Sequence, residues 1–186
     1  MSYFIEISIF GRVSDPQAVH ELVEAVRDEE GLDEGIDESD VFARLQDASS
    51  RGAAVEFSGN GYDDVFHDVT VACQKAGLSY VWTIGESTGE GPTNGKAWKP
   101  GMSDEITFMM HDRRPGVALA TIAAAAKIGI EAVNELVSTV ASATRVGKIE
   151  FAPGFNEAYH AFLDELEDGS ENKDADEDVA DHGMRP

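Results

Sequence analysis

The chain has 186 residues, with 36 acidic side chains against 14 lysines and arginines, and a formal net charge of −22. A chain this acidic repels polyanions, so we expect no direct binding to nucleic acid and none to anionic membranes. Its single cysteine, Cys73, excludes an internal disulfide and fits a cytoplasmic protein. The N-terminus has no basic segment before its first apolar run, so we expect no signal peptide.

The first half of the chain alternates between strand and helix patterns. Residues 3–10 alternate apolar and polar side chains, which predicts a half-buried strand. Asp15 and Pro16 then supply the N-cap and the first residue of a helix. Turn residues and apolar periodicity predict four further elements: a short helix over 39–48, a strand over 53–59, a helix over 62–76 and a strand over 78–84.

The second half begins with residues 85–104, which are rich in Gly, Pro, Ser and Thr and predict a long loop. A single long helix is predicted over 115–144. Its charge-free run between Arg114 and Lys127 has only 12 residues, fewer than the roughly 20 that a bilayer span needs, so we expect a core helix of a protein. The remaining predicted elements are strands over 105–111 and 148–151 and a helix over 155–166.

These elements predict an α+β fold. Helices between strands and one strand hairpin favour a two-layer sandwich with a mixed five-stranded sheet. Its helices would lie mainly on one face, in an arrangement similar in spirit to ferredoxin-like folds. We expect a single domain over residues 1–167. Residues 168–186 lack aromatic side chains and almost all large apolar ones, so we expect a disordered acidic tail there.

One face of such a sheet would be apolar and uncovered by helices. It could form a homodimer or bind a partner, or the 85–104 loop or the last helix could cover it, and the pattern favours neither outcome. The residues expected on this face are Phe4, Phe10, Val81, Thr83, Met109 and His111.

The acidity is concentrated in two stretches. Residues 164–186 contain ten acids and two bases, residues 28–40 contain eight acids and no base, and the remainder contains 18 acids and 12 bases. Runs of like charge stay solvated and often serve for interaction. We expect residues 28–40 to bind a basic partner in preference to the tail, because ordered elements flank them. This acidic block consists of Asp28, Glu29, Glu30, Asp33, Glu34, Asp37, Glu38 and Asp40.

Trp98 lies between Lys96 and Lys99 in the predicted loop. A tryptophan exposed on a loop is a common interface anchor, so Trp98 is a ninth candidate for partner binding. The alternative is that its ring folds back onto the apolar surface of its own domain.

No motif in the sequence predicts a catalytic residue, a cofactor or a metal. Residues 85–89 match G-x-S-x-G, but the residues that follow cannot form the helix that this motif requires. Gly95 precedes a lysine as in a phosphate-binding loop, but Ala97 replaces the required hydroxyl. Acid and histidine pairs at helical spacing, such as Glu157 with His160, occur singly and favour exposed helix faces over metal sites.

The sequence therefore favours a non-catalytic acidic protein that binds a basic partner protein. Such a protein could be a nucleic-acid mimic, an inhibitor of a nucleic-acid-binding enzyme or an immunity protein. The alternative is a small enzyme or ligand-binding domain with its site under the 85–104 loop, formed by Ser87, Lys96, Trp98 and His111. A third hypothesis, acidity that serves only solubility at high salt, requires charge on every face, whereas these acids are clustered.

Overall fold

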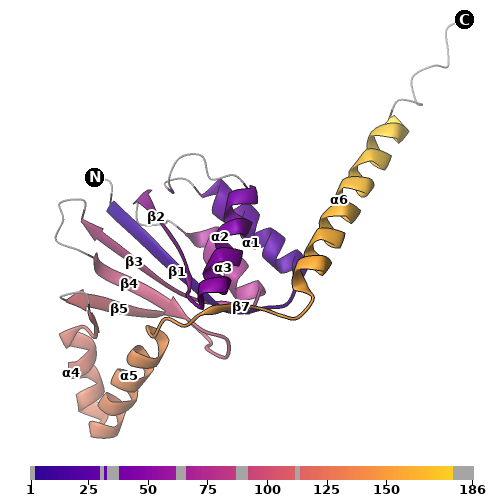
Figure 1. Ribbon diagram of the computed structural model, residues 1–186. Coiled ribbons are helices and arrows are strands. Elements are labelled where there is room, and N and C mark those ends of the chain that lie inside the picture. Colours follow the sequence, from indigo (N-terminus) through magenta and orange to yellow (C-terminus); the bar gives the residue numbers. More distant parts are fainter. Residues whose placement is uncertain are drawn as a thin grey trace, which may run out of the picture.

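The computed structural model describes residues 3–29, 32, 38–61, 66–86, 92–111 and 114–177, apart from the side chains of residues 38, 86, 92, 93 and 169–177. Over these residues it shows an α+β fold with six helices and seven strands, as Figure 1 shows. The predicted α+β class is therefore confirmed, and the predicted number of five strands is too small.

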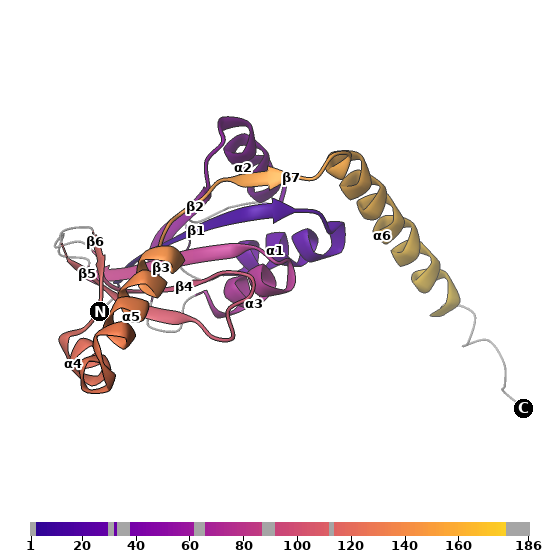
Figure 2. The same ribbon diagram turned by 90° about the horizontal axis from the view of Figure 1, so that it is seen from below.

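The sheet is built around β1 (Tyr3–Val13), whose alternating pattern was recognisable in the sequence. It pairs antiparallel with both β2 (Val55–Gly61) and β3 (Ser79–Glu86). The short strand β7 (Ile149–Phe151) pairs parallel with residues 11–13, at the end of β1 (Figure 2). The sequence predicted that strands joined by helical crossovers pair in parallel. This prediction is wrong for β1 and β2, which are joined through helices but pair antiparallel.

The sheet continues from β3 as an antiparallel meander of β4 (Pro92–Trp98), β5 (Ile106–His111) and β6 (Arg114–Gly116). Its strand order, β2-β1-β3-β4-β5-β6, differs in detail from a ferredoxin-like sheet. The predicted loop over 85–104 is wrong, because β4 occupies seven of those residues. Small and polar side chains in β4 concealed its alternation between the two faces.

Three helices cover one face of the sheet: α1 (Pro16–Asp28), α2 (Glu38–Arg51) and α3 (His67–Lys75). Asp15 caps α1 as predicted, since its Oδ1 accepts the backbone N–H groups of Gln17 and Ala18. The main core lies between these helices and the sheet, where Ile5, Ile7 and Ile9 of β1 are fully buried.

The helix predicted over 115–144 is two helices, α4 (Leu119–Ile128) and α5 (Ile130–Ala143). The chain reverses at Gly129, whose φ of 153° suits a residue without a side chain. Apolar residues continue across this glycine, and for that reason the pattern predicted one helix. The two helices lie side by side as a hairpin that projects from the β5–β6 end of the sheet (Figures 1 and 2).

The last helix, α6 (Phe155–Glu177), begins against α1 and then leaves the body of the molecule (Figure 1). Phe155 and Tyr159 bury its first turns in the main core, and the Phe162 ring meets the edge of His20, with centroids 5.7 Å apart. The predicted boundary between domain and tail at residue 168 falls inside this helix. Residues 178–186 lie outside the described part of the chain.

Candidate interaction surfaces

The acidic block connects the end of α1 to the start of α2. The structure describes the side chains of Asp28, Glu29 and Asp40 and the backbone of Glu38, where α2 begins. The other four acids of the block lie outside the described residues: Glu30, Asp33, Glu34 and Asp37.

Two contacts fix the block to the body of the protein. Leu32, in the middle of the block, is only 9% exposed, belongs to the main core and forms a single antiparallel bridge with Gly59 of β2. Glu29 accepts the backbone N–H of Phe66 at 3.0 Å, directly before α3. A carboxylate at this position accepts a hydrogen bond from an N–H group that has no partner within the helix. Its negative charge also interacts favourably with the positive end of the helix dipole. The block is therefore held at both points.

The contact of Glu29 also supports a strained residue. Phe66 is fully buried and adopts a φ of 67°, in the left-handed region that costs a side chain about 1–3 kcal/mol. Burial of the ring and the hydrogen bond from its backbone to Glu29 hold this conformation. The prediction that Glu29 contacts a partner is not tested here, but the structure shows that its carboxylate serves the fold.

The other two described acids of the block are exposed. Asp28 accepts two hydrogen bonds from the guanidinium of Arg27, at 2.8 and 3.2 Å, and these bonds lower the pKa of Asp28 below its ordinary value. Asp40 lies in the first turn of α2, where a negative charge interacts favourably with the helix dipole. Both carboxylates are open to solvent.

Trp98 packs on its own domain. It is half-buried against the main core, its ring stacks on that of Tyr80 with centroids 6.2 Å apart, and its Nε1 donates to the carbonyl oxygen of Met102 at 3.2 Å. This geometry matches the second of the two expectations from the sequence. A role for Trp98 in partner binding stays a prediction.

Lys96, another candidate from the predicted loop, belongs to a polar cluster formed by side chains of β3, β4 and α3 and by Glu105, directly before β5. Its Nζ lies 3.1 Å from Oε2 of Glu105 and 5.6 Å from the centroid of the Trp82 ring. The Tyr80 hydroxyl donates to Oε1 of Glu105 at 2.7 Å and accepts from Gln74 at 2.9 Å. Burial, together with Glu105, raises the pKa of Tyr80 above its ordinary value, so the phenol stays protonated. These polar groups bond to one another and brace the sheet.

The remaining residues of the enzyme alternative are Ser87 and His111. Ser87 lies outside the described residues, and His111 is exposed at the end of β5.

Cys73 is fully buried, as its place on an apolar helix face predicted, and burial raises the pKa of its thiol. Across the described part of the chain, no group of three or more His, Cys, Asp or Glu side chains is placed to hold a metal ion.

The face of the sheet opposite α1, α2 and α3 is covered in part by α5. Val140 and Ala143, in the last turns of α5, are buried against Phe10, Val81 and Phe108 in a second, smaller core. Met102, from the predicted 85–104 loop, also packs against this smaller core, whereas no described side chain of the last helix belongs to it. Of the residues predicted on this face, Phe4 remains 43% exposed.

Two residues predicted on that face lie on the other side of the sheet. Met109 pairs with Asn94, and Asn94 pairs with Ile84, a residue of the main core. Because paired residues share a face, Met109 and His111 belong to the face that α1 and α3 partly cover. The prediction was wrong because β4, which sets the register between β3 and β5, was not recognised.

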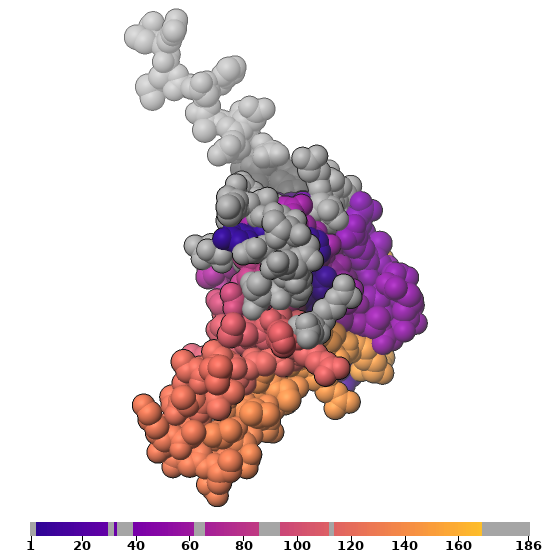
Figure 3. Space-filling view, turned by 90° about the vertical axis from the view of Figure 1, so that its left-hand side faces the viewer, coloured from indigo at the N-terminus to yellow at the C-terminus, as the bar shows by residue number. Residues whose placement is uncertain are grey.

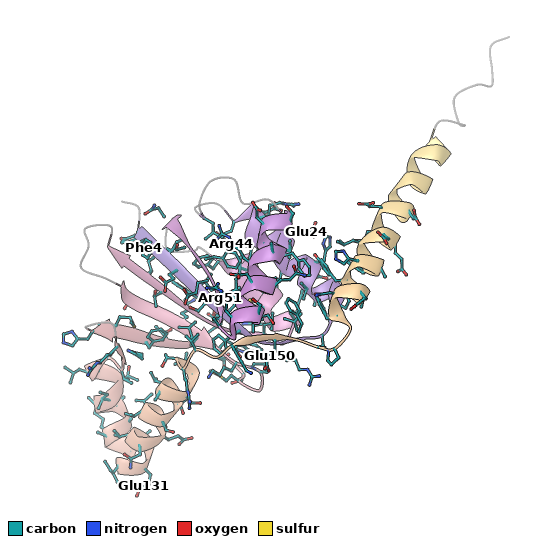
Figure 4. The ribbon with its side chains drawn as sticks, viewed as in Figure 1. Phe4, Glu24, Arg44, Arg51, Glu131 and Glu150 are labelled. Carbon is teal, nitrogen blue, oxygen red and sulfur yellow. The ribbon has the colours of Figure 1, made fainter. Side chains whose placement is uncertain are left out.

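The α4–α5 hairpin carries the large apolar side chains with the highest exposed fractions of the described surface, a feature that the sequence pattern did not predict. No residue of α4 is buried. Figure 3 shows the hairpin protruding from the body, and Figure 4 shows Glu131 at its far tip. The exposed fractions of its large apolar side chains are 84% for Leu119, 83% for Ile128, 64% for Ile130 and 50% for Val137.

A pocket of about 360 Å³ lies where α2 ends beside β2, at Arg44 and Arg51 (Figure 4). Arg51 pairs with Asp47 at 2.7 Å, and the Arg44 guanidinium lies 5.8 Å from the centroid of the Phe57 ring. Glu56 adds a second carboxylate to the lining. With charges of both signs on its wall, the pocket does not define an anion site.

Comparison with protein-family models, curated proteins and solved structures found no match to this chain. Over the described residues, no helix is long and apolar enough to cross a membrane. The protein is thus defined by its own geometry, as an α+β protein with an anchored acidic block and an exposed apolar hairpin.

Proposed function

We propose that this chain is a non-catalytic binding protein whose acidic block engages a basic surface of a partner protein. One observation carries the proposal: the block is anchored to the core at Leu32 and to the start of α3 at Glu29. A segment held at two points before binding loses less conformational entropy on association, so charges beside those points contribute more to affinity. Complementary charge also speeds encounter and suppresses wrong partners.

A nucleic-acid mimic, an inhibitor of a nucleic-acid-binding enzyme and an immunity protein all use an acidic surface in this way. Each presents carboxylates to arginines and lysines that otherwise contact phosphate groups or another acidic surface. The acidic part of α6 could add long-range attraction, but among the described side chains of this helix, those that pack in the main core belong to its first turns. We therefore assign recognition to the block and give the tail a supporting role.

Two variants that each remove seven acids would test this assignment. The first changes every acid of the block except Glu29 to its amide, which preserves the bond to Phe66. The second ends the chain at Glu167 and removes the seven acids of residues 168–186. Each is immobilised beside the wild type, exposed to a lysate of the native host, eluted with a rising NaCl gradient, and the eluted proteins are identified by mass spectrometry.

We expect the wild type to retain basic proteins that elute as salt screens the contact. The block variant should lose them, while the shortened chain should keep them with somewhat earlier elution. Equal losses from the two variants would make net charge, and not the block, the cause. Retention by both variants, without dependence on salt, would refute the proposal.

A further inference from the structure

The face of the sheet opposite α1, α2 and α3 carries a polar patch where β1 lies between β2 and β3. Ile5, Ile7 and Ile9 of β1 point into the main core, so the residues between them point to the opposite face. Residues paired across strands share a face, which adds their partners from β2 and β3. We call this patch the carboxylate face, and it consists of Phe4, Glu6, Ser8, Glu56, Ser58 and Thr83.

The two carboxylates of this face have no basic partner in the described part of the chain. Glu6 pairs with Ser58 and Glu56 with Ser8, so the glutamates are diagonal neighbours on adjacent strands. Such neighbours lie about 7–8 Å apart, within reach of each other's long side chains. Partial burial and the charge of Glu56 raise the pKa of Glu6 above its ordinary value. A cation placed between the two carboxylates would relieve this repulsion.

Ser8 is a buried hydroxyl on the same face. It is only 7% exposed, lies directly opposite Glu56 and follows Glu6 by two positions. Among the described residues, its Oγ takes part in no hydrogen bond. Buried polar side chains of native proteins nearly always have a hydrogen-bond partner. An unpaired hydroxyl that points toward two unpaired carboxylates therefore indicates a ligand with several N–H donors.

The arginines of the α2 pocket do not supply these donors. Arg44 and Arg51 share the pocket wall with Glu56, but neither forms an ion pair with it. Arg51 pairs with Asp47 at 2.7 Å, and the Arg44 guanidinium lies 5.8 Å from the centroid of the Phe57 ring. Phe57 belongs to the main core, on the other side of β2 from Glu56.

The chemistry of the carboxylate face suits an arginine side chain. A guanidinium presents five N–H donors in one plane, enough for both carboxylates and a hydroxyl, whereas an ammonium presents three from a single nitrogen. Phe4, which is 43% exposed, precedes Glu6 by two positions and offers its ring to the apolar stem of an arginine (Figure 4). Aromatic rings also attract guanidinium groups through the charge distribution of the ring.

The carboxylate face adjoins the acidic block. Leu32, in the middle of the block, bridges to Gly59, which follows Ser58 in β2. Only the width of β2 thus separates Leu32 from Glu6 on β1, because Glu6 pairs with Ser58. A partner protein that binds the block can reach the carboxylate face with a neighbouring side chain.

From this geometry we propose that the carboxylate face binds an arginine side chain of the partner protein. Its stem packs on Phe4, and its guanidinium donates to the carboxylates of Glu6 and Glu56 and to the hydroxyl of Ser8. The inference rests on the proposed function, to which it adds a second contact region and the type of residue that this region recognises.

A small probe tests the site in the absence of the partner. N-acetylarginine amide presents one guanidinium and uncharged ends. Titrated into the isotopically labelled full chain and followed by NMR, it should shift the backbone amide signals of the carboxylate face saturably, with a dissociation constant of about 1–10 mM. The lysine counterpart, Nα-acetyllysine amide, should bind at least about threefold more weakly, because it lacks the planar set of donors.

Two double variants with the same loss of charge show whether the glutamates hold the probe. Glu6→Gln with Glu56→Gln should weaken its binding at least about fivefold, since charge-assisted hydrogen bonds are lost. Glu157→Gln with Glu165→Gln, at exposed positions of α6, is the control and should change binding less than about twofold, because exposed charges at a distance are screened. The dispersion of the NMR signals shows that each variant keeps its fold.

Absence of a saturable shift at the carboxylate face, or equal weakening by the two double variants, would overturn the arginine site. The link to the partner is tested in the lysate experiment, where Glu6→Gln with Glu56→Gln should elute the retained proteins at lower salt than the wild type. Unchanged elution would refute the contribution of this face to partner binding. Failure of the proposed function is a separate result, because it is read from the block variant and the probe requires no partner.

Discussion

Gly95 of β4 is a residue at which the sheet leaves no room for a side chain. A Cβ atom there would lie 2.4 Å from Cζ of Phe108 and 2.6 Å from the carbonyl oxygen of Trp82. Phe108 is the cross-strand partner of Gly95 and covers it with its ring. We expect Gly95→Ala to lower the free energy of unfolding by about 1–3 kcal/mol, because the ring or the backbone must shift.

Urea denaturation measures this change, and Gly116→Ala is its matched control. Gly116 also pairs with β5, but a Cβ atom at this position would lie 3.9 Å from its nearest neighbour, the carbonyl oxygen of Met109. The control should change stability by less than about 0.5 kcal/mol. Equal effects of the two substitutions would show that loss of glycine flexibility, and not the contact with Phe108, determines the cost.

Single residues were predictable from the sequence where their effect is local. The cap formed by Asp15 depends on nearby backbone N–H groups, and the burial of Cys73 follows from its helix face. The hydrogen bond from Phe66 to Glu29 joins residues 37 positions apart, so no local pattern could show it. The space at Gly95 likewise depends on a strand pairing that the sequence did not reveal.

At the scale of elements, α6 has one part that contacts the body and another that extends beyond it. Among its described side chains, those of residues 155–163 make the apolar contacts of α6 with the body. At about 0.15 M NaCl, where charge repulsion is largely screened, we therefore expect the chain shortened to residues 1–167 to unfold at the same temperature as the full chain, within about 2 °C. Differential scanning calorimetry measures both midpoints.

Phe162→Ala is the counterpart of that truncation, since it removes a contact and leaves the length of α6 unchanged. Phe162 is half-buried against His20, so its loss should cost less than the about 3–5 kcal/mol typical of a fully buried phenylalanine, but should still lower the midpoint. A large loss of stability on truncation would show that residues beyond 167 contribute to the fold.

Elements were predictable where their apolar period was regular, and they were missed where it was not. β1 and α1 have regular periods of two and 3.6 residues, and their predicted positions agree with the structure. β4 lacks such a period, because Asn94 and Lys96 stand on one face and Gly95 on the other. The break at Gly129 was missed for the opposite reason, since apolar residues continue on both sides of it. Because β4 was not predicted, Met109 was also assigned to the wrong face of the sheet.

At the scale of the whole molecule, the net charge of −22 opposes folding, because it concentrates like charges in a compact volume. Ion pairs on the surface offset little of this repulsion: those of Lys75 with Glu21 and Arg51 with Asp47 are largely exposed, and such pairs contribute at most about 1 kcal/mol each. Long-range repulsion is screened by salt, whose Debye length falls from about 30 Å at 0.01 M to about 8 Å at 0.15 M.

We therefore expect the thermal midpoint to rise by several degrees when NaCl is raised from about 0.01 M to about 0.15 M, as measured by circular dichroism. The chain ending at Glu167 lacks seven acids and should show a smaller rise, because less repulsion remains to be screened. A midpoint that falls with salt would mean that local ion pairs outweigh the repulsion. A chain that folds only at molar salt would instead support the hypothesis that its acidity serves a high-salt environment, since clustered charge alone requires only modest screening.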